Sequence, residues 1–186
     1  MKRFFDVVIA LIGLLVLFIP GLLIALAIKL NSKGPVIHWS KRIGKNNTIF
    51  FMPKFRTMQI NTPQKATHLL KDSSLHITGF GYILRKLSLD ELPQLYSVLK
   101  SDMSLVGPRP ALFNQHDLIE LRTNSKLHKL KPGITGWAQV NGRDELTIEE
   151  KVKFDSEYLL KNSISFDLYI IWLTIRKLLN KEGITH

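Results

Sequence analysis

The first thirty residues hold an apolar run that constrains the fold more than any other part of the chain. From Phe4 to Leu30 the only charged residues are Asp6 and Lys29. As one continuous helix, the run would reach about 40 Å at ~1.5 Å per residue. That length is enough to cross a hydrocarbon core of ~30 Å. The plainest interpretation is therefore a helix that spans a membrane.

Pro20 and the flanking charges favour a second interpretation. Proline inside a helix kinks or breaks it, and Pro20-Gly21 lies within the run. Basic residues favour the cytoplasmic side of a membrane, and they flank the run at both ends, as Lys2, Arg3, Lys29, Lys33, Lys41 and Arg42. A helix that enters one leaflet, bends at Pro20 and returns fits both observations, if other groups satisfy the backbone at the bend.

A cleaved signal peptide is a third interpretation. Lys2-Arg3, the apolar run and Ala25-Leu26-Ala27 together imitate such a peptide, although the run is long for one. The residues by themselves leave the straight span, the re-entrant helix and the signal peptide open.

The overall charge is strongly positive. The 186 residues include 26 Lys+Arg against 15 Asp+Glu, a formal net charge of +11. Nucleic acid, anionic lipid and phosphorylated small molecules are natural partners for such a surface. The chain has no cysteine, which excludes disulfides and thiolate chemistry. Its length suits one domain with an appendage.

The rest of the chain predicts a small domain of mixed helices and strands. A β-hairpin is expected around residues 36–39 and 48–55, and residues 61–78 read as an irregular loop with a short helix. Helices are expected over residues 92–100 and 113–130, and from the capping-box sequence Thr147-Ile-Glu-Glu150 to about Leu160. The glycine-rich residues 131–145 predict a loop, a strand and a second loop.

The last apolar stretch, Phe166 to Leu179, is too short to span a bilayer. Its Trp172, Arg176 and Lys177, with Lys181 just beyond, suit an amphipathic helix at a membrane interface. A core helix packed on the domain is an equally good interpretation of the same residues.

The sequence LSLDELPQLY places two carboxylates, Asp90 and Glu91, side by side before Pro93. Because proline is tolerated only near a helix start, a helix should begin close to Asp90. Ser88 and Glu91 also match a capping box, so the acids could simply complement the helix dipole. The same position suits chemistry, since Asp can act as a nucleophile and Mg²⁺ favours one or two carboxylates with substrate phosphates.

Phosphate chemistry also needs cations, and the chain supplies them near turn signals. Arginine matches phosphate oxygens with two parallel hydrogen bonds. The candidates are Lys54, Arg56, Arg85, Arg109 and Arg143. Arg109 lies between two prolines, which should fix its backbone and aim its guanidinium. The six histidines show no metal-ligand spacing, and the sequence has no Walker-type loop.

Taken in order, these segments resemble one family. The sequences KRFFDVVIALIGLL, KFRTM, LRKLSLDELPQL, VLKSDMSLVGPRP and KPGITGWAQVNGR closely resemble those of the monotopic phosphoglycosyl transferases, bacterial sugar transferases that begin glycan assembly on a lipid carrier. The resemblance runs from Lys2 to about Gly183, and it is strongest to members that work in capsule, O-antigen or protein-glycan pathways.

The resemblance implies an α/β (α+β) membrane-associated fold. Residues 1–30 would form a re-entrant membrane helix bent at Pro20. Residues 31–186 would form a cytoplasmic catalytic domain with a C-terminal interfacial helix, on the cytoplasmic face of the bacterial inner membrane, in contact with anionic lipid. Some members carry serine just before the bend proline, where its hydroxyl can satisfy freed backbone groups, whereas this chain has Ile19. Its oligomeric state stays open.

The resemblance also implies an activity: transfer of a sugar 1-phosphate from a UDP-sugar to polyprenyl (undecaprenyl) phosphate, with UMP released and Mg²⁺ required. Asp90 matches the nucleophile that forms a phosphosugar intermediate, and Glu91 matches its partner, so both are expected to be catalytic and to serve the metal. The basic residues that match the family's motifs are expected to bind phosphate; they are Lys54, Arg85, Arg109 and Arg143. The sugar itself cannot be read, although an N-acetylated UDP-sugar is expected.

Two other functions are compatible with parts of the sequence. A membrane-tethered nucleic-acid-binding protein would use the positive charge, but the basic residues are scattered and no known reader motif is present, so no nucleic acid is expected. A glycosyltransferase that releases UDP would use the same donor. The adjacent acids and the family motifs argue against that second alternative.

Overall fold

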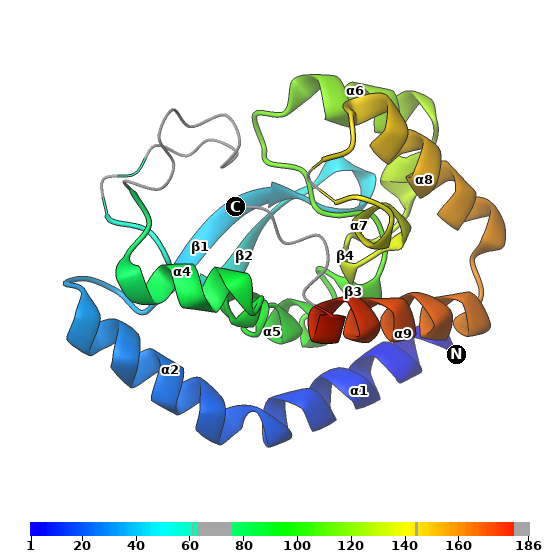
Figure 1. The fold of residues 1–186 in the computed structure, drawn as a ribbon. Helices are drawn as coiled ribbons and strands as arrows, with labels where there is room; N and C mark the ends of the chain where they lie inside the picture. The colour runs from blue at the N-terminus through cyan, green and yellow to red at the C-terminus, as the bar shows by residue number, and fades with distance from the viewer. Residues whose placement is uncertain (61, 63–75, 144, 181–186) are drawn as a thin grey trace.

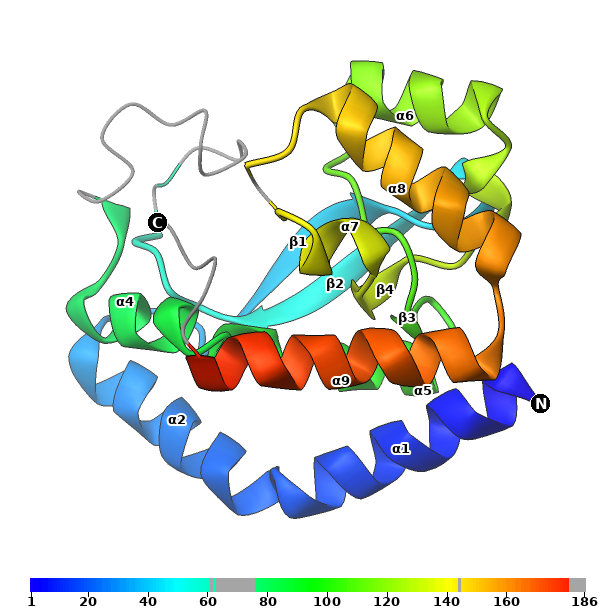
Figure 2. The same ribbon diagram turned by 45° about the vertical axis from the view of Figure 1, so that its right-hand side comes forward.

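The computed structural model describes residues 1–60, 62, 76–143 and 145–180. The expected loop and short helix over residues 61–78 lie largely outside this described part. The fold is mixed, with helices and small sheets. Two helices, α1 (Lys2–Val16) and α2 (Phe18–Asn31), form a V along the bottom of the molecule in Figures 1 and 2. The rest of the domain lies above this V.

Within the described residues, no single helix has both the length and the apolar character needed to cross a membrane, whereas α1 and α2 together do, with a bend of 60° between them. The helices meet at Leu17, so the expected bend at Pro20 in fact lies three residues earlier. The reason is that proline has no N–H for the carbonyl four residues before it, here that of Val16, and its ring clashes with that carbonyl. The hydrogen bond from Gly21 N to Leu17 O, 2.8 Å long, restores the helix immediately afterwards.

The expected hairpin is confirmed. β1 (Ile37–Ile43) pairs antiparallel with β2 (Ile49–Phe55) around a short turn, η1 (Lys45–Asn47). Side chains alternate between the two faces. Phe50 and Met52 therefore enter the main core, while Trp39 and Phe51 are more than half exposed on the other face.

A second, two-stranded sheet is parallel. It joins β3 (Ser104–Val106) to β4 (Gly133–Thr135). The strand predicted within residues 131–145 is confirmed as β4, whereas β3 and the parallel pairing were not predicted. The backbones approach so closely that a Cβ on Gly133 would stand 2.1 Å from the amide nitrogen of Gly107. Glycine is therefore required where the two strands meet.

The remaining helices differ in part from expectation. They are α4 (Gly79–Lys86), η3 (Leu89–Glu91), α5 (Gln94–Leu99), α6 (His116–Asn124), η4 (Leu127–Lys129), α7 (Trp137–Val140), α8 (Ile148–Lys161) and α9 (Ile164–Asn180). The helix expected over 113–130 is shorter, because Ser125 ends it and Lys126 turns into the left-handed region. The one-turn α7 was not expected. The capping box at Thr147 and Glu150 is confirmed.

Two apolar clusters hold the domain on the V. The main core joins Ala10 of α1 to Val98 of α5 and Ile170 of α9. The second cluster joins Ile24 and Ile28 of α2 to residues of β2 and α4. The C-terminal helix α9 thus has one buried face, while Leu168, Trp172 and Ile175 remain about half exposed. The buried face confirms the packing of this helix on the domain, and the interfacial role of its exposed face stays a prediction.

Candidate active site

The acid pair lies on a tight turn between two helices. After α4, Ser88 adopts the left-handed region at φ 54°, which reverses the chain into η3. Leu89 and Leu92 on either side of the acids pack against the cluster formed with α2. The turn is therefore fixed by apolar contacts, and Asp90 and Glu91 belong to a segment anchored on the apolar cluster that includes α2.

The capping box predicted for Ser88 and Glu91 is wrong. Ser88 makes no capping hydrogen bond, and its hydroxyl is buried without a partner among the described residues. Pro93, rather than Asp90, is the residue that precedes α5. Local pattern misled here because Glu91 turns toward distant cations instead of its own backbone.

Glu91 is the centre of a cation cluster. Its Oε1 atom lies 2.8 Å from Lys54 Nζ, 3.2 Å from Arg109 Nη2 and 3.6 Å from Arg143 Nη2. Burial alone would raise the pKa of Glu91, but these three cations together hold it well below its ordinary value. Glu91 is therefore a carboxylate at all physiological pH values.

Asp90 has a different environment although it is the next residue. Its carboxylate is 3.7 Å from Lys54 Nζ, and the residue is only 8% exposed. Burial, with help from the neighbouring Glu91, raises the pKa of Asp90, while Lys54, Arg85 and Arg109 oppose that rise. The two adjacent acids thus have pKa values pushed in opposite directions, as in sites where paired carboxylates take different roles.

Lys54 is shared between both acids. It lies on β2, opposite His38 of β1. Burial lowers the pKa of Lys54, and Glu91 and Asp90 counteract that effect. His38 was not singled out from sequence, although the hairpin register would have placed it beside Lys54. Burial, with Arg42 and Lys54, lowers the pKa of His38, so this side chain is neutral at pH 7.

The arginines come from three different elements. Arg85 is near the end of α4, and its Nε donates to Thr57 Oγ1 over 2.9 Å. Arg109 follows β3 in a loop over residues 107–111, called the GPRP loop from its first four residues. Arg143 follows α7, in a turn where Gly142 and Arg143 both have positive φ, of 150° and 54°. The structure thus brings all six predicted site residues into one neighbourhood, and it adds Thr57, which no pattern in the sequence marked.

Arg56 does not belong to this cluster. Its guanidinium donates to the carbonyl oxygens of Ser32 and Lys33 and to the Ser32 hydroxyl, at 2.6–2.9 Å. These acceptors follow the end of α2. The expectation that Arg56 binds phosphate is therefore wrong, because this buried side chain instead joins the segment after α2 to the end of β2.

The donor set at the acids can accommodate Mg²⁺ only with help from a substrate. Among the described residues, no group of three or more His, Asp or Glu side chains could hold a metal ion. Two carboxylates are present, and Lys54 and Arg109 already occupy Glu91 Oε1. Asp90 and oxygens of a bound phosphate would make up the kind of ligand set that Mg²⁺ uses.

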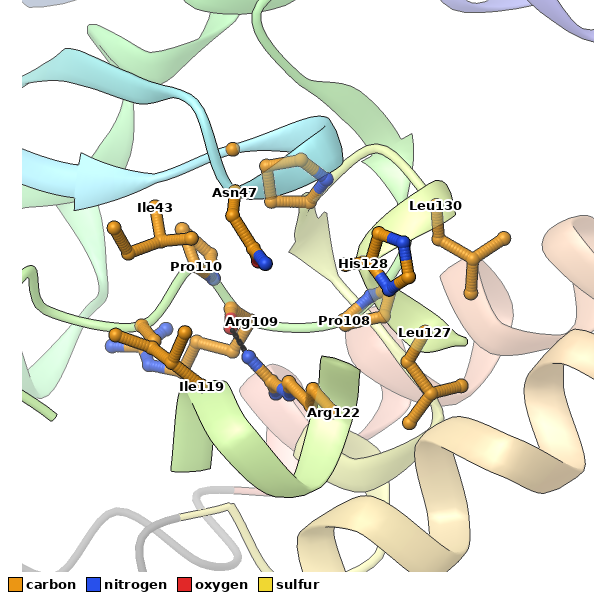
Figure 3. A pocket seen from close by; sticks show the side chains of 13 residues that line it. Ile43, Asn47, Pro108, Arg109, Pro110, Ile119, Arg122, Leu127, His128 and Leu130 are labelled. Atoms are coloured by element: carbon orange, nitrogen blue, oxygen red, sulfur yellow. Dashed lines mark hydrogen bonds between the residues drawn. The ribbon is translucent and has the colours of Figure 1, made fainter. Parts of the chain in front are cut away.

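A small pocket lies against the GPRP loop, and Pro108, Arg109 and Pro110 form part of its lining (Figure 3). Its lining includes Ile43, Asn47, Pro108 and His128, and its volume is about 30 Å³. That volume has room for water but not for a sugar nucleotide. The pocket is thus part of the support of the loop rather than a substrate site.

Comparison with known proteins gives consistent matches over nearly the whole chain. The family model described as bacterial sugar transferase matches residues 1–181. The uncharacterized sugar transferase EpsL of Bacillus subtilis is 42% identical, over 99% of this chain and 90% of that protein.

Relatives with more specific names are longer. The UDP-glucose:undecaprenyl-phosphate glucose-1-phosphate transferase of Escherichia coli is 41% identical over 95% of this chain, and the UDP-N-acetylgalactosamine-undecaprenyl-phosphate N-acetylgalactosaminephosphotransferase of Aeromonas hydrophila is 39% identical over 98%. The chain spans 40% and 44% of the lengths of these two proteins.

Proposed function

Because the chain belongs to the bacterial sugar transferase family, we propose that it transfers a sugar 1-phosphate from a UDP-sugar to undecaprenyl phosphate. The reaction forms a covalent phosphosugar intermediate on Asp90 and releases UMP, as the first membrane step of glycoconjugate assembly. The names of the E. coli and Aeromonas relatives support both the donor class and the acceptor. The observation that carries the proposal is the buried acid pair, with opposed pKa shifts, among three arginines and a lysine.

In the first step, a carboxylate oxygen of Asp90 attacks the phosphorus that bears the sugar. A bond forms between the Asp90 oxygen and this phosphorus, and the bond from the phosphorus to the bridging oxygen of the diphosphate breaks. UMP leaves with the bridging oxygen and the electron pair of the broken bond. Arg109, Arg143 and Lys54 suit the role of holding the diphosphate, because preorganised cations stabilise charge that develops during phosphoryl transfer.

In the second step, an oxygen of undecaprenyl phosphate attacks the same phosphorus. The bond to Asp90 breaks, the carboxylate is restored, and the product is undecaprenyl diphosphate sugar. Glu91 is ionised throughout, so it suits the role of fixing Lys54 and the arginines between the two displacements. Mg²⁺, when bound by Asp90 and phosphate oxygens, would neutralise diphosphate charge and relieve the repulsion between the acids.

The placement of the site suits a lipid acceptor. Side chains of α1 and α2 that face away from the domain are apolar and 50–77% exposed, among them Leu11, Leu15, Ile19, Leu23 and Leu30. An exposed apolar surface of this kind fits insertion into a membrane. Since Leu89 and Leu92 pack against the apolar cluster that α2 shares with β2 and α4, a re-entrant α1–α2 pair in the inner membrane would hold Asp90 near the cytoplasmic headgroups. The exposed face of α9 would rest on anionic lipid.

Nucleotide release tests the proposal directly. Purified protein in nanodiscs would be given undecaprenyl phosphate, Mg²⁺ and a panel of UDP-sugars, with Asp90→Asn assayed beside the wild type. We expect UMP from the wild type with one or a few donors, and none from Asp90→Asn. Denaturing mass spectrometry without acceptor should show one added phosphosugar on the wild type alone.

The matched control is Asp117→Asn, an exposed acid in the first turn of α6, which should release UMP at the wild-type rate. Release of UDP instead of UMP would overturn the covalent mechanism and favour a simple glycosyltransferase. Full UMP release from Asp90→Asn would show that Asp90 is not the nucleophile.

A further inference from the structure

The GPRP loop has an unusual set of hydrogen bonds. Its two prolines have no N–H, so the loop depends on its carbonyl groups to fix its path. The carbonyls of Pro108 and Ala111 accept from the backbone nitrogens of Gly133 and Ile43, over 2.9 and 3.0 Å. The two carbonyls between them accept from side chains, those of Arg122 and Arg42.

Arg122 makes the shorter of these side-chain bonds. Its Nη1 donates to the carbonyl oxygen of Arg109 over 2.8 Å, the bond drawn as a dashed line in Figure 3. Its other two nitrogens, Nε and Nη2, donate to Asp155 Oδ2 over 3.0 and 2.7 Å. Asp155, on α8, is 1% exposed, so the guanidinium is held in one orientation by a fixed anion.

This arrangement connects a buried ion pair to the cation cluster. Asp155 holds Arg122, Arg122 holds the backbone of Arg109, and the side chain of Arg109 donates to Glu91 over 3.2 Å. Within the described part of the chain, neither Arg122 nor Asp155 forms a hydrogen bond or ion pair with Asp90 or Glu91, so they act on the site only through the loop. The local sequence gives no sign of the link, because α6 and α8 lie far along the chain from the acids.

We propose that Arg122, held by Asp155, is a positioning residue for the sugar-phosphate transfer: it fixes the backbone of Arg109 so that the Arg109 guanidinium meets the diphosphate of the donor. This inference rests on the proposed function. It goes beyond stability, since replacing a buried ion pair by apolar residues is often neutral or stabilising. A pair retained only for folding could therefore be exchanged without harm to the reaction.

The test uses that exchange. The double variant Arg122→Met/Asp155→Leu removes the ion pair and the donor to the Arg109 carbonyl but leaves no buried charge unpaired. We expect an unchanged or raised Tm and a loss of about 10- to 100-fold in kcat/KM for the UDP-sugar, the scale of a small misplacement of a catalytic group. Arg122→Lys keeps a hydrogen-bond donor and the positive charge beside Asp155, so its loss of kcat/KM should be smaller. If the double variant does not fold, Arg122→Lys takes its place in the test.

A matched pair and a double-mutant cycle make the test specific. Glu120→Met/Lys153→Leu replaces two exposed residues of opposite charge on the same two helices by apolar residues, and it should leave kcat/KM unchanged. In an Arg109→Ala background, the Arg122→Met/Asp155→Leu exchange should cause no further loss, because its effect passes through Arg109. Wild-type kcat/KM in the folded exchange variant, or an undiminished loss in the Arg109→Ala background, would overturn the inference.

Hydrogen exchange separates this inference from the proposed function. Peptides that cover residues 105–113 should exchange about tenfold faster in Arg122→Met/Asp155→Leu, whereas peptides from β1 should not change. If the wild type releases no UMP but the loop is loosened, the proposed function fails and the positioning link stands. If the wild type is active and Arg122→Met/Asp155→Leu keeps both the wild-type kcat/KM and the wild-type hydrogen exchange of the loop, the inference alone fails.

Discussion

At the scale of single residues, Asp90 and Glu91 show how neighbours in sequence acquire different chemistry. Glu91 reaches three cations and stays ionised, whereas Asp90 is buried with a weaker set of partners and has a raised pKa. Lys54 contributes to both, at 2.8 Å from Glu91 and 3.7 Å from Asp90. The pair is thus tuned by one shared lysine on the hairpin.

The pH dependence of the reaction should report this tuning. A nucleophilic Asp90 must be ionised, so kcat/KM should fall as pH drops through the pKa of Asp90, which lies above the ordinary aspartate value. Because Lys54 lowers that pKa, Lys54→Met should raise it further and move the acid limb of the pH–rate profile to higher pH, in addition to lowering the rate. Steady-state kcat/KM measured from about pH 4 to about pH 8, a range that covers raised carboxylate pKa values, would detect the shift of the acid limb.

Lys41→Met supplies the control for this measurement. Lys41 is on the opposite face of the same hairpin, where its ammonium lies over the ring of Phe113. Its removal should leave the acid limb in place. An acid limb that is the same in wild type and Lys54→Met would mean that the titrating group is not Asp90.

At the scale of elements, the α1–α2 bend would decide how the chain meets a membrane under the proposed function. Pro20 removes one N–H and crowds the carbonyl of Val16, so the break at Leu17 has a local cause. Ile19 offers no hydroxyl to the freed backbone group. The bend therefore depends on Pro20 and on the anchoring of both helices to the domain.

Labelling can test the re-entrant placement, since the chain has no cysteine of its own. A cysteine in a short N-terminal tag and one at Lys45→Cys, in the exposed hairpin turn, should react with an impermeant reagent from the same side of oriented membrane vesicles. Pro20→Ala restores the N–H and removes a helix-breaking effect of ~3 kcal/mol. It should therefore increase the fraction of N-termini that react from the other side.

The control for the bend is Pro35→Ala, because Pro35 lies beyond the end of α2. This change should leave the labelling pattern of the wild type unaltered. If the wild-type N-terminus and residue 45 react from opposite sides, the pair spans the membrane and the re-entrant placement is wrong.

At the scale of the whole molecule, polar contacts join α1 to the rest of the domain. Asp6 is 3% exposed and accepts from Ser104 Oγ over 2.8 Å and from Leu105 N over 3.2 Å. Lys2 donates to Asp167 of α9 and to the carbonyl of Val106. The start of the membrane-type helix is thereby joined to β3, which leads directly into the GPRP loop.

Asp6→Ala should loosen this connection. It leaves two buried donors without an acceptor, at a cost of ~1–3 kcal/mol each, so Tm in detergent should fall by several degrees. Exposed Asp117→Ala should change Tm little. A Tm for Asp6→Ala equal to that of Asp117→Ala would mean that α1 is held by apolar contacts alone.

Several features of this molecule follow from local patterns in its sequence. The alternation of apolar and polar residues predicted the hairpin, and Thr147 and Glu150 predicted the start of α8. The apolar run with Pro20 predicted a bent helical segment suited to a membrane. These features depend on period, turn chemistry and caps, which are properties of neighbouring residues. The six candidate site residues were predicted from their types and from the family resemblance, and the structure places them in one neighbourhood.

The interactions among those residues depend on how distant segments of the chain pack together. Ser88 and Glu91 look like a capping box, and Arg56 looks like a phosphate ligand beside Lys54. Long-range contacts overrule both patterns, because Glu91 finds cations from β2 and two loops, and Arg56 finds carbonyls after α2. The support of Arg109 by Arg122 and Asp155 was likewise invisible, since hydrogen bonds between distant segments follow from how the helices pack and leave no local pattern in the chain.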